Sequence, residues 1–189
     1  MISRTIVPIV NQKNIPVQGS NESGLGDIVQ SLFFSPKAPT SDGWIWGVGP
    51  VLMLNSASDD TLGSGKWGVG PSLIALKQDG ALTYGMLANH IESFAGDKGR
   101  SYVSASLVQP FVAFVIDTTK TTLSLNSEST YDWSNRQWSV PVNAGVYQML
   151  KVGDQIMQAG VGARYWADSP ENGPDGWGLR MQLTFLFAK

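Results

Sequence analysis

The chain has 189 residues, of which 42% are apolar and 15% charged, with a formal net charge of -2 and no cysteine. Soluble domains usually carry about a quarter of charged residues, so this chain has few charges with which to cover a water-facing surface. The small net charge gives no reason to expect nucleic acid as a partner. The lack of cysteine excludes disulfides, thiolate metal sites and cysteine nucleophiles. The length suits one domain over residues 1–189.

The first ten residues, MISRTIVPIV, lack the charged leader, apolar core and cleavage site of a signal peptide. The longest mostly apolar stretch, 107–116, is about half of the roughly 20 residues that a membrane-spanning helix needs. We therefore expect no spanning helix. We also expect either a cytosolic protein or a sequence that begins downstream of its export signal.

Alternation of apolar and polar residues predicts about ten strands and almost no helix. The alternation is strictest over 121–133, where Leu123 and Leu125 lie on one face of the predicted strand and Asn126 and Glu128 on the other. In chain order, the predicted strands cover 3–12, 24–35, 43–55, 66–78, 81–93, 101–117, 121–133, 137–151, 155–167 and 176–187.

The connections between these strands alternate between short and long. Short turns such as QDG, TTKTT and VGD are interleaved with long polar stretches such as NSASDDTLGSGK, SFAGDKGRS and ADSPENGPDG. Outer-membrane barrels show this pattern, with the short turns on the periplasmic side. We predict an all-β fold: an antiparallel up-and-down transmembrane β-barrel of about ten strands in which each strand pairs with its sequence neighbours. A soluble meander or sandwich is the alternative.

The motif WGVGP occurs twice, at 46–50 and at 67–71, and an apolar row follows each copy. An indole at the end of such a row can keep its ring in lipid and its N–H among the headgroups. We expect the glycines to leave the inner wall of the barrel thin where the sheet bends. The aromatics expected at the membrane interfaces are Trp44, Trp46, Trp67, Trp133, Trp138 and Trp177.

Strand parity separates a lipid-facing row from a lumenal row. A charge on the lipid face would cost roughly 2–4 kcal/mol near the bilayer midplane, so charged strand residues are expected inside. The residues expected to face lipid are Leu123, Leu125, Val140, Val142, Met181, Leu183 and Phe185. The residues expected to line the lumen are Asn126, Glu128, Asp132, Gln158, Arg164, Arg180 and Gln182.

Arg164 and Arg180 fall at a similar depth on adjacent predicted strands. Two guanidinium groups at one level repel each other unless a carboxylate lies between them. We predict a charged cluster that joins both arginines to Glu128 or Asp132 near the long-loop end. The cluster either constricts a pore or fills and stiffens the barrel.

Prolines are the main objection to a barrel. A closed barrel has no free edge at which a missing N–H is harmless, although bulges can absorb prolines. The prolines inside predicted strands are Pro8, Pro50, Pro71, Pro110 and Pro141.

An enzymatic reading rests on His90, the only histidine, with Glu92 and Ser93 nearby. Some outer-membrane barrels hydrolyse lipids with Ser, His and an acid. In one strand, however, His90 and Glu92 share a face while Ser93 points the other way. We expect no enzyme, no metal site and no cofactor, because ligands with suitable spacing are missing.

Seven segments spread over nearly the whole chain carry a resemblance to a known family: GLGDIVQSLFFSP, GWIWGVGPVLML, KWGVGPSLIALKQ, TYGMLANHIESFAGD, LVQPFV, STYDWSNRQWSVPVNAGV and WGLRMQLTFLF. They resemble the bacterial outer-membrane β-barrel family named after the meta-pathway of phenol degradation. The resemblance implies a transporter in the outer membrane for small, aromatic or apolar molecules, and about twelve strands in a full-length relative. The chain departs from the family by lacking a signal peptide and a segment before Ile2, and by ending in LFAK.

Three functions therefore compete. The first is a narrow channel or transporter whose partners are the lipid bilayer and a small-molecule substrate. The second is a structural outer-membrane barrel with a plugged lumen. The third is a soluble ligand-binding β-barrel or sandwich, which would need no detergent.

Overall fold

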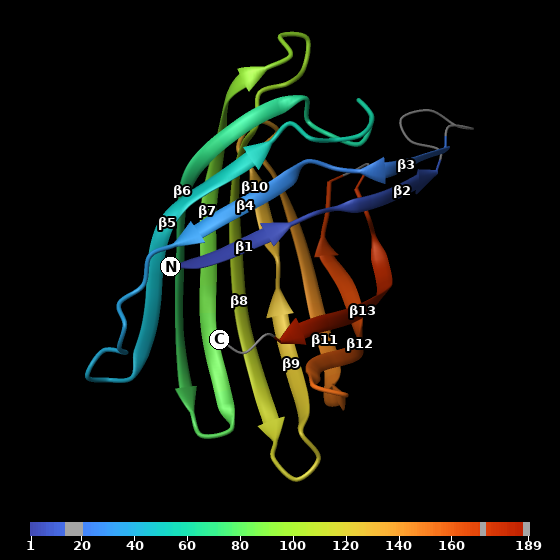
Figure 1. Cartoon of the computed structure of the whole chain (residues 1–189). Helices are drawn as coiled ribbons and strands as arrows, with labels where there is room; N and C mark the ends of the chain where they lie inside the picture. Colours follow the sequence, from blue (N-terminus) through green and yellow to red (C-terminus); the bar gives the residue numbers. More distant parts are fainter. Residues whose placement is uncertain (14–20, 171–172, 187–189) are drawn as a thin grey trace.

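The computed structural model describes residues 1–13, 21–170 and 173–186, and these residues form strands and loops but no helix. Short turns such as β6–β7 and β8–β9 lie at the bottom of Figure 1, and the longer β5–β6 and β7–β8 loops lie at the top. The strands are β1 (Ile2–Ile6), β2 (Ile9–Lys13), β3 (Asn21–Leu25), β4 (Ile28–Phe33), β5 (Trp44–Leu54), β6 (Lys66–Asp79), β7 (Leu82–Gly96), β8 (Ser104–Ile116), β9 (Thr121–Ser127), β10 (Ser129–Asp132), β11 (Gln137–Val152), β12 (Gln155–Asp168) and β13 (Gly176–Leu186).

Eleven of these strands form one antiparallel sheet in the order β1-β4-β5-β6-β7-β8-β10-β11-β12-β13. The strand β9 lies end to end with β10, in the same place between β8 and β11. The strands β2 and β3 pair with each other in a separate ladder, which continues the pairing of β1 with β4 beyond a break. The predicted all-β antiparallel fold is confirmed. Among the described strands, β1 and β13 are the edges of the sheet and share no ladder, so closure into a transmembrane barrel stays a prediction.

The sheet curls strongly. In Figure 1, β1 and β13 lie in front of β7, β8 and β9, although they are the outermost strands in the order. One hydrogen bond crosses the concave side, from Arg4 Nη2 on β1 to Gln109 Oε1 on β8, at 3.4 Å. We call this concave side the lumenal face and the opposite side the outer face.

The described residues form thirteen strands where about ten were predicted, because three predicted strands are interrupted. The stretch 3–12 divides into β1 and β2, and 24–35 overlaps both β3 and β4. These two breaks face each other, since Gly26 N donates to Pro8 O at 2.9 Å. Proline cannot donate to a ladder, so the ladder is interrupted at this point and resumes beyond it one residue out of register.

The third break divides 121–133 into β9 and β10 and has a proline on each side. On β8, the ladder to β10 ends at Val108 and the ladder to β9 begins at Phe111, which leaves Pro110 at the gap. On β11, the ladder to β10 ends at Ser139 and the ladder to β9 begins at Val142, which leaves Pro141 at the gap. The register of β11 against β12 also shifts between Val140 and Pro141. Breaks and bulges therefore accommodate both prolines, since neither must supply a ladder N–H.

The WGVGP repeats lie side by side, with Pro50 opposite Pro71 in the β5–β6 ladder. A Cβ at Gly49 would collide with the carbonyl oxygen of Leu32, and a Cβ at Gly70 with that of His90. The repeat therefore lets neighbouring backbones approach closely beside a proline. The expected bare inner wall is wrong at Gly47, where Phe33 packs against the glycine.

The outer face is apolar and exposed throughout, and over β9–β13 the inner face is polar, which is the reverse of an ordinary soluble domain. Outer-face side chains such as Leu179 (74% exposed) and Met181 (73%) are apolar and exposed, whereas Asn143 on the lumenal face is 2% exposed. Soluble proteins rarely expose an apolar surface of this extent. The residues that were expected to face lipid are exposed except Val140, which is half-buried; they are Leu123, Leu125, Val142, Met181, Leu183 and Phe185.

Candidate functional site on the lumenal face

The break between β9 and β10 positions the central carboxylate of the site. Glu128 belongs to neither strand, and its N–H donates to Pro141 O at 3.2 Å across the break. The flanking serines bond each other, with Ser127 Oγ and Ser129 Oγ 2.7 Å apart. The side chain of Glu128 points toward β12 and β13, where it meets two arginines.

Glu128 pairs with one arginine through each carboxylate oxygen. Oε1 accepts from Arg180 Nη1 at 2.9 Å, and Oε2 makes a short contact with Arg164 Nη2. These three side chains are only 24–28% exposed, so water weakens their attraction less than it does for a surface pair. The predicted cluster of two arginines and a carboxylate is therefore present.

A cross-strand row of polar side chains holds Arg164 in place. Its Nε donates to Asn143 Oδ1 at 2.6 Å, and Asn143 Nδ2 donates to Asn126 Oδ1 at 2.8 Å. The three residues stand opposite one another on β9, β11 and β12. The Arg164 guanidinium also lies 5.3 Å from the ring centre of Trp166. These contacts hold the Arg164 side chain, so it acts as a fixed support for Glu128.

Arg180 and Glu128 line a lumenal cavity of about 370 Å³, and a third arginine, Arg4 from β1, lines it too. Arg4 Nη2 makes the long bond to Gln109 described above. Arg4 Nη1 is buried and has no hydrogen-bond partner among the described residues. A guanidinium in the wall of this cavity therefore has one unpaired nitrogen, which neighbouring atoms cover.

Amide and hydroxyl groups complete the lining. Gln158 Nε2 donates to Thr122 Oγ1 at 3.1 Å, and Gln182 Nε2 donates to Thr184 Oγ1 at 3.2 Å. Of the seven residues expected to line the lumen, two do not line this cavity. Arg164 contacts Glu128 in the cavity wall, whereas Asp132 lies elsewhere. The five that line the cavity are Asn126, Glu128, Gln158, Arg180 and Gln182.

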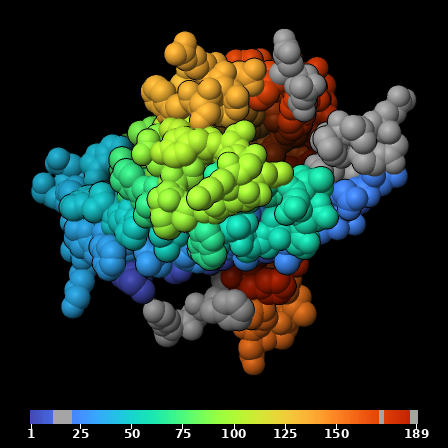
Figure 2. Space-filling view, turned by 90° about the horizontal axis from the view of Figure 1, so that it is seen from above, coloured from blue at the N-terminus to red at the C-terminus, as the bar shows by residue number. Residues whose placement is uncertain are grey.

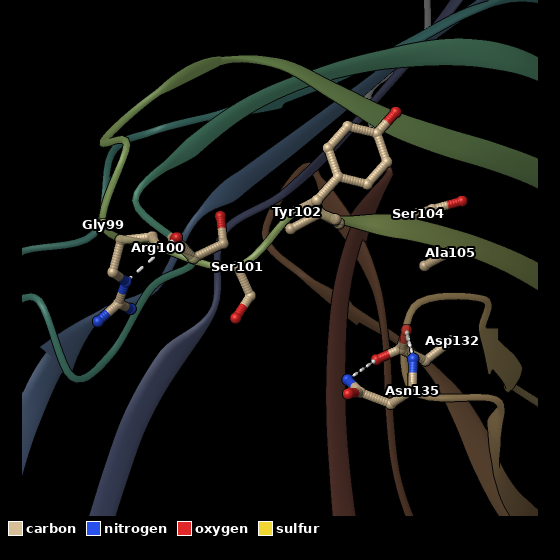
Figure 3. Close-up of a pocket in the computed structure, with 10 residues that line it drawn as sticks. Gly99, Arg100, Ser101, Tyr102, Ser104, Ala105, Asp132 and Asn135 are labelled. Carbon is tan, nitrogen blue, oxygen red and sulfur yellow. Dashed lines mark hydrogen bonds between the residues drawn. The ribbon is translucent and has the colours of Figure 1, made fainter.

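Asp132 serves a turn and does not contact the arginine cluster in the described structure. Its Oδ1 accepts from the N–H groups of Ser134 and Asn135 at 2.8 and 3.0 Å, and its Oδ2 accepts from Asn135 Nδ2 at 2.7 Å. Figure 3 shows Asp132 and Asn135 facing a cavity near the β7–β8 loop residues Ser101 and Tyr102. Figure 2 looks onto this loop end, where yellow-green residues near position 100 lie over the middle of the view.

Three important lumenal residues were missed from the sequence: Arg4, Gln109 and Asn143. Arg4 shares its strand parity with Ile2 and Ile6, so alternation gave no sign that it points inward. Gln109 likewise stands between Leu107 and Phe111 on its face. Asn143 did carry a signal, because it alternates with the predicted lipid-facing residue Val142.

His90 lies on the outer face near the long-loop end. Its Nδ1 is 2.9 Å from Ser106 Oγ, its Nε2 is 3.5 Å from Glu92 Oε1, and Trp133 Nε1 donates to the same Ser106 oxygen at 2.9 Å. Ser93 is buried on the opposite face, as its parity predicted. The cross-strand partner Ser106 was not foreseen. That the protein is no enzyme stays a prediction.

Exposed aromatic side chains gather near both ends of the sheet. Trp44 packs edge-on against Tyr84 near the short turns, with ring centres 5.8 Å apart. Near the long loops, Tyr131 lies 4.8 Å from Trp133, and Tyr165 lies 5.0 Å from Trp177. All of the tryptophans expected at the interfaces are exposed: Trp44, Trp46, Trp67, Trp133, Trp138 and Trp177.

Comparisons with protein-family models, with curated proteins and with solved structures find no match to this chain. The described residues include no apolar helix of membrane-spanning length. They also include no group of three or more His, Asp or Glu side chains that could hold a metal ion.

Proposed function

We propose that the protein is a bacterial outer-membrane β-barrel that lets small molecules pass through its lumen. The observation that carries the proposal is the reversed polarity of the sheet. Apolar side chains are exposed on the outer face, and hydrogen-bonded polar and charged groups are gathered on the lumenal face. A lipid solvent outside and a wet lumen inside require this distribution.

Two further features support the same function. Aromatic pairs near both ends of the sheet suit the girdles that sit at bilayer interfaces. The lumenal cavity of about 370 Å³ offers polar groups to a passing solute. The resemblance noted in the sequence favours small, aromatic or apolar molecules as substrates. The function proposed needs no cofactor and no chemical step.

Planar-bilayer recordings test the proposal. The purified chain should insert and conduct, and the double variant Arg164→Gln/Arg180→Gln should shift ion selectivity toward cations because two positive charges leave the lumen. Unchanged selectivity in a folded variant would remove the cluster from the mechanism. A chain that stays monodisperse in buffer without detergent would favour the soluble ligand-binding alternative.

A structural barrel with a filled lumen is the second candidate, and the Glu128 cluster favours it. Both oxygens of Glu128 hold an arginine, which ties β12 and β13 to the β9–β10 break. Such a cross-link stiffens the sheet whether or not solutes pass. Insertion into the bilayer without any conductance would support this candidate.

A further inference from the structure

We infer that the lumenal cavity binds a small carboxylate, with Arg4 and Arg180 as its charged partners. The inference deepens the proposed function, because it names the class of solute that the lumenal site would select. It depends on three observations: the balance of charge, an unpaired donor, and the mixed lining of the cavity.

The charge balance of the cluster is positive. Arg4, Arg164 and Arg180 face a single carboxylate, Glu128, and both oxygens of that carboxylate are already paired with Arg164 and Arg180. No other Asp or Glu among the described residues lines the cavity. Because charges interact strongly away from bulk water, this wall attracts anions and repels cations.

Arg4 supplies the donor without a partner, and a carboxylate reaches it once the atoms that cover it move aside. Its Nη1 is buried without a partner among the described residues, and its Nη2 makes only the 3.4 Å bond to Gln109. A buried donor left unpaired costs free energy, and a planar guanidinium fork matches a carboxylate with two parallel N–H···O bonds. A bound carboxylate would satisfy Arg4 in the way that Glu128 satisfies Arg164 and Arg180.

The remaining lining favours an organic anion over an inorganic one. Phe111 and the buried Tyr147 contribute aromatic surface to the same cavity, and Asn126, Gln158 and Gln182 contribute amides. A volume of about 370 Å³ is at the small end of ligand pockets. A carboxylate on a compact aromatic body fits these groups, and benzoate is the simplest probe.

The test is calorimetric titration of benzoate into the full 189-residue chain in detergent micelles, with circular dichroism to verify that each variant is folded. The wild type should bind, and Arg4→Gln should weaken binding by at least about tenfold, since it removes a charge-assisted donor pair. Arg4→Lys keeps the charge but loses the planar guanidinium fork, so its affinity for benzoate should lie between those of the wild type and Arg4→Gln. Arg136→Gln, an exposed turn residue, is the matched control and should bind as the wild type does.

The inference is overturned if the wild type shows no saturable binding, or if folded Arg4→Gln binds as well as the wild type. Should Arg4→Gln fail to fold, Arg4→Lys and Arg180→Gln decide by the same criterion. Bilayer recordings separate this result from the proposed function. Binding by a chain that does not conduct upholds the carboxylate site and refutes the channel, and conduction without binding does the opposite.

Discussion

The two halves of the sheet have similar outer faces and different inner faces. On the outside, β5 and β6 expose Val48 and Leu73 much as β11 and β13 expose Val146 and Leu183. On the inside, β4, β5 and β7 bury a packed apolar group of Phe33, Val51, Met53 and Leu87. The inside of β9–β13 instead holds the arginine–glutamate cluster and the row of amides.

The surroundings fix the composition of the outer face, whereas the composition of the lumenal face can differ between the two halves. Lipid would impose one composition on every outward position, so both halves share it. The lumenal face is under no such constraint, and one half uses it for packing while the other uses it for charge. A site for solutes therefore belongs where the charge gathers, on β9–β13 together with Arg4 from β1.

The largest expected effect is on the packed half. Phe33→Ala removes a side chain that is 2% exposed and should lower the free energy of unfolding by about 3–5 kcal/mol through the cavity it leaves. The neighbouring Phe34 is 57% exposed, so Phe34→Ala should cost much less. Denaturant unfolding of both variants in detergent gives the comparison, and equal losses would mean that the first half is not packed inside.

In the charged half, Glu128→Gln leaves Arg164 and Arg180 facing each other without a counter-charge. We expect a loss of about 3 kcal/mol in the free energy of unfolding, toward the low end for a broken buried pair because the groups are about a quarter exposed. Asp132→Asn, which alters only a turn, should cost about 1 kcal/mol or less. If the two variants unfold alike, the cluster does not stabilise this half.

The outer face is probed by Leu183→Arg, which should impair membrane assembly by roughly 2–4 kcal/mol if the residue lies near the midplane. The control is Gln182→Glu, which places a charge on the adjacent lumenal residue, where it can pair with the Arg180 guanidinium. Heat-modified migration on gels reports assembly. A Leu183→Arg protein that assembles like the wild type would show that this face does not meet lipid.

A smaller effect is expected from Ser106→Ala on the outer face. The change removes the hydroxyl between His90 and Trp133 and should lower stability by about 1 kcal/mol. Because we expect no catalysis, a fluorophosphonate probe should label neither the wild type nor the variant in lipid vesicles. Labelling of the wild type alone would identify Ser106 as a nucleophile and refute the expectation.

The smallest effect concerns the exposed β5–β6 loop. The side-chain and backbone hydrogen bonds from Thr61 lower the pKa of the Asp59 carboxyl below its usual value. A depressed pKa means that the ionised form stabilises the loop above the usual carboxyl pKa, and this contribution is lost as pH falls through the lowered value. The wild type and Asp59→Asn should thus converge in thermal midpoint at acid pH, and a gap that widens on acidification would contradict the assignment.

Much of the fold could be predicted because period-two alternation reports strand faces directly. The pairing of Glu128 with Arg164 and Arg180 was also predictable, since parity placed all three on one face. The strand breaks were not predictable, because the effect of Pro110 and Pro141 depends on which strands lie beside them. The inward direction of Arg4 depends on the curl of the whole sheet, and nothing in its own segment records that curl.

Asp132 illustrates a local signal that competed with parity. The segment Asp132-Trp133-Ser134-Asn135 carries the turn-forming residues that draw an aspartate side chain back to nearby N–H groups. Asp132 lies at the end of a strand, and these local hydrogen bonds hold its carboxylate in the turn. Glu128 lies at the break between β9 and β10, where no such turn competes for its carboxylate. Its carboxylate therefore pairs with the two arginines.

The most direct test of the reversed polarity uses single-cysteine spin labels, one at a time, at 179, 180, 181, 182 and 183 of this cysteine-free chain in lipid vesicles. A sheet with lipid outside and water inside predicts alternation. Labels at Leu179, Met181 and Leu183 should be relaxed mainly by oxygen dissolved in lipid, and labels at Arg180 and Gln182 mainly by a water-soluble nickel chelate. Equal access of the nickel chelate to all five positions would contradict a lipid-facing outer surface.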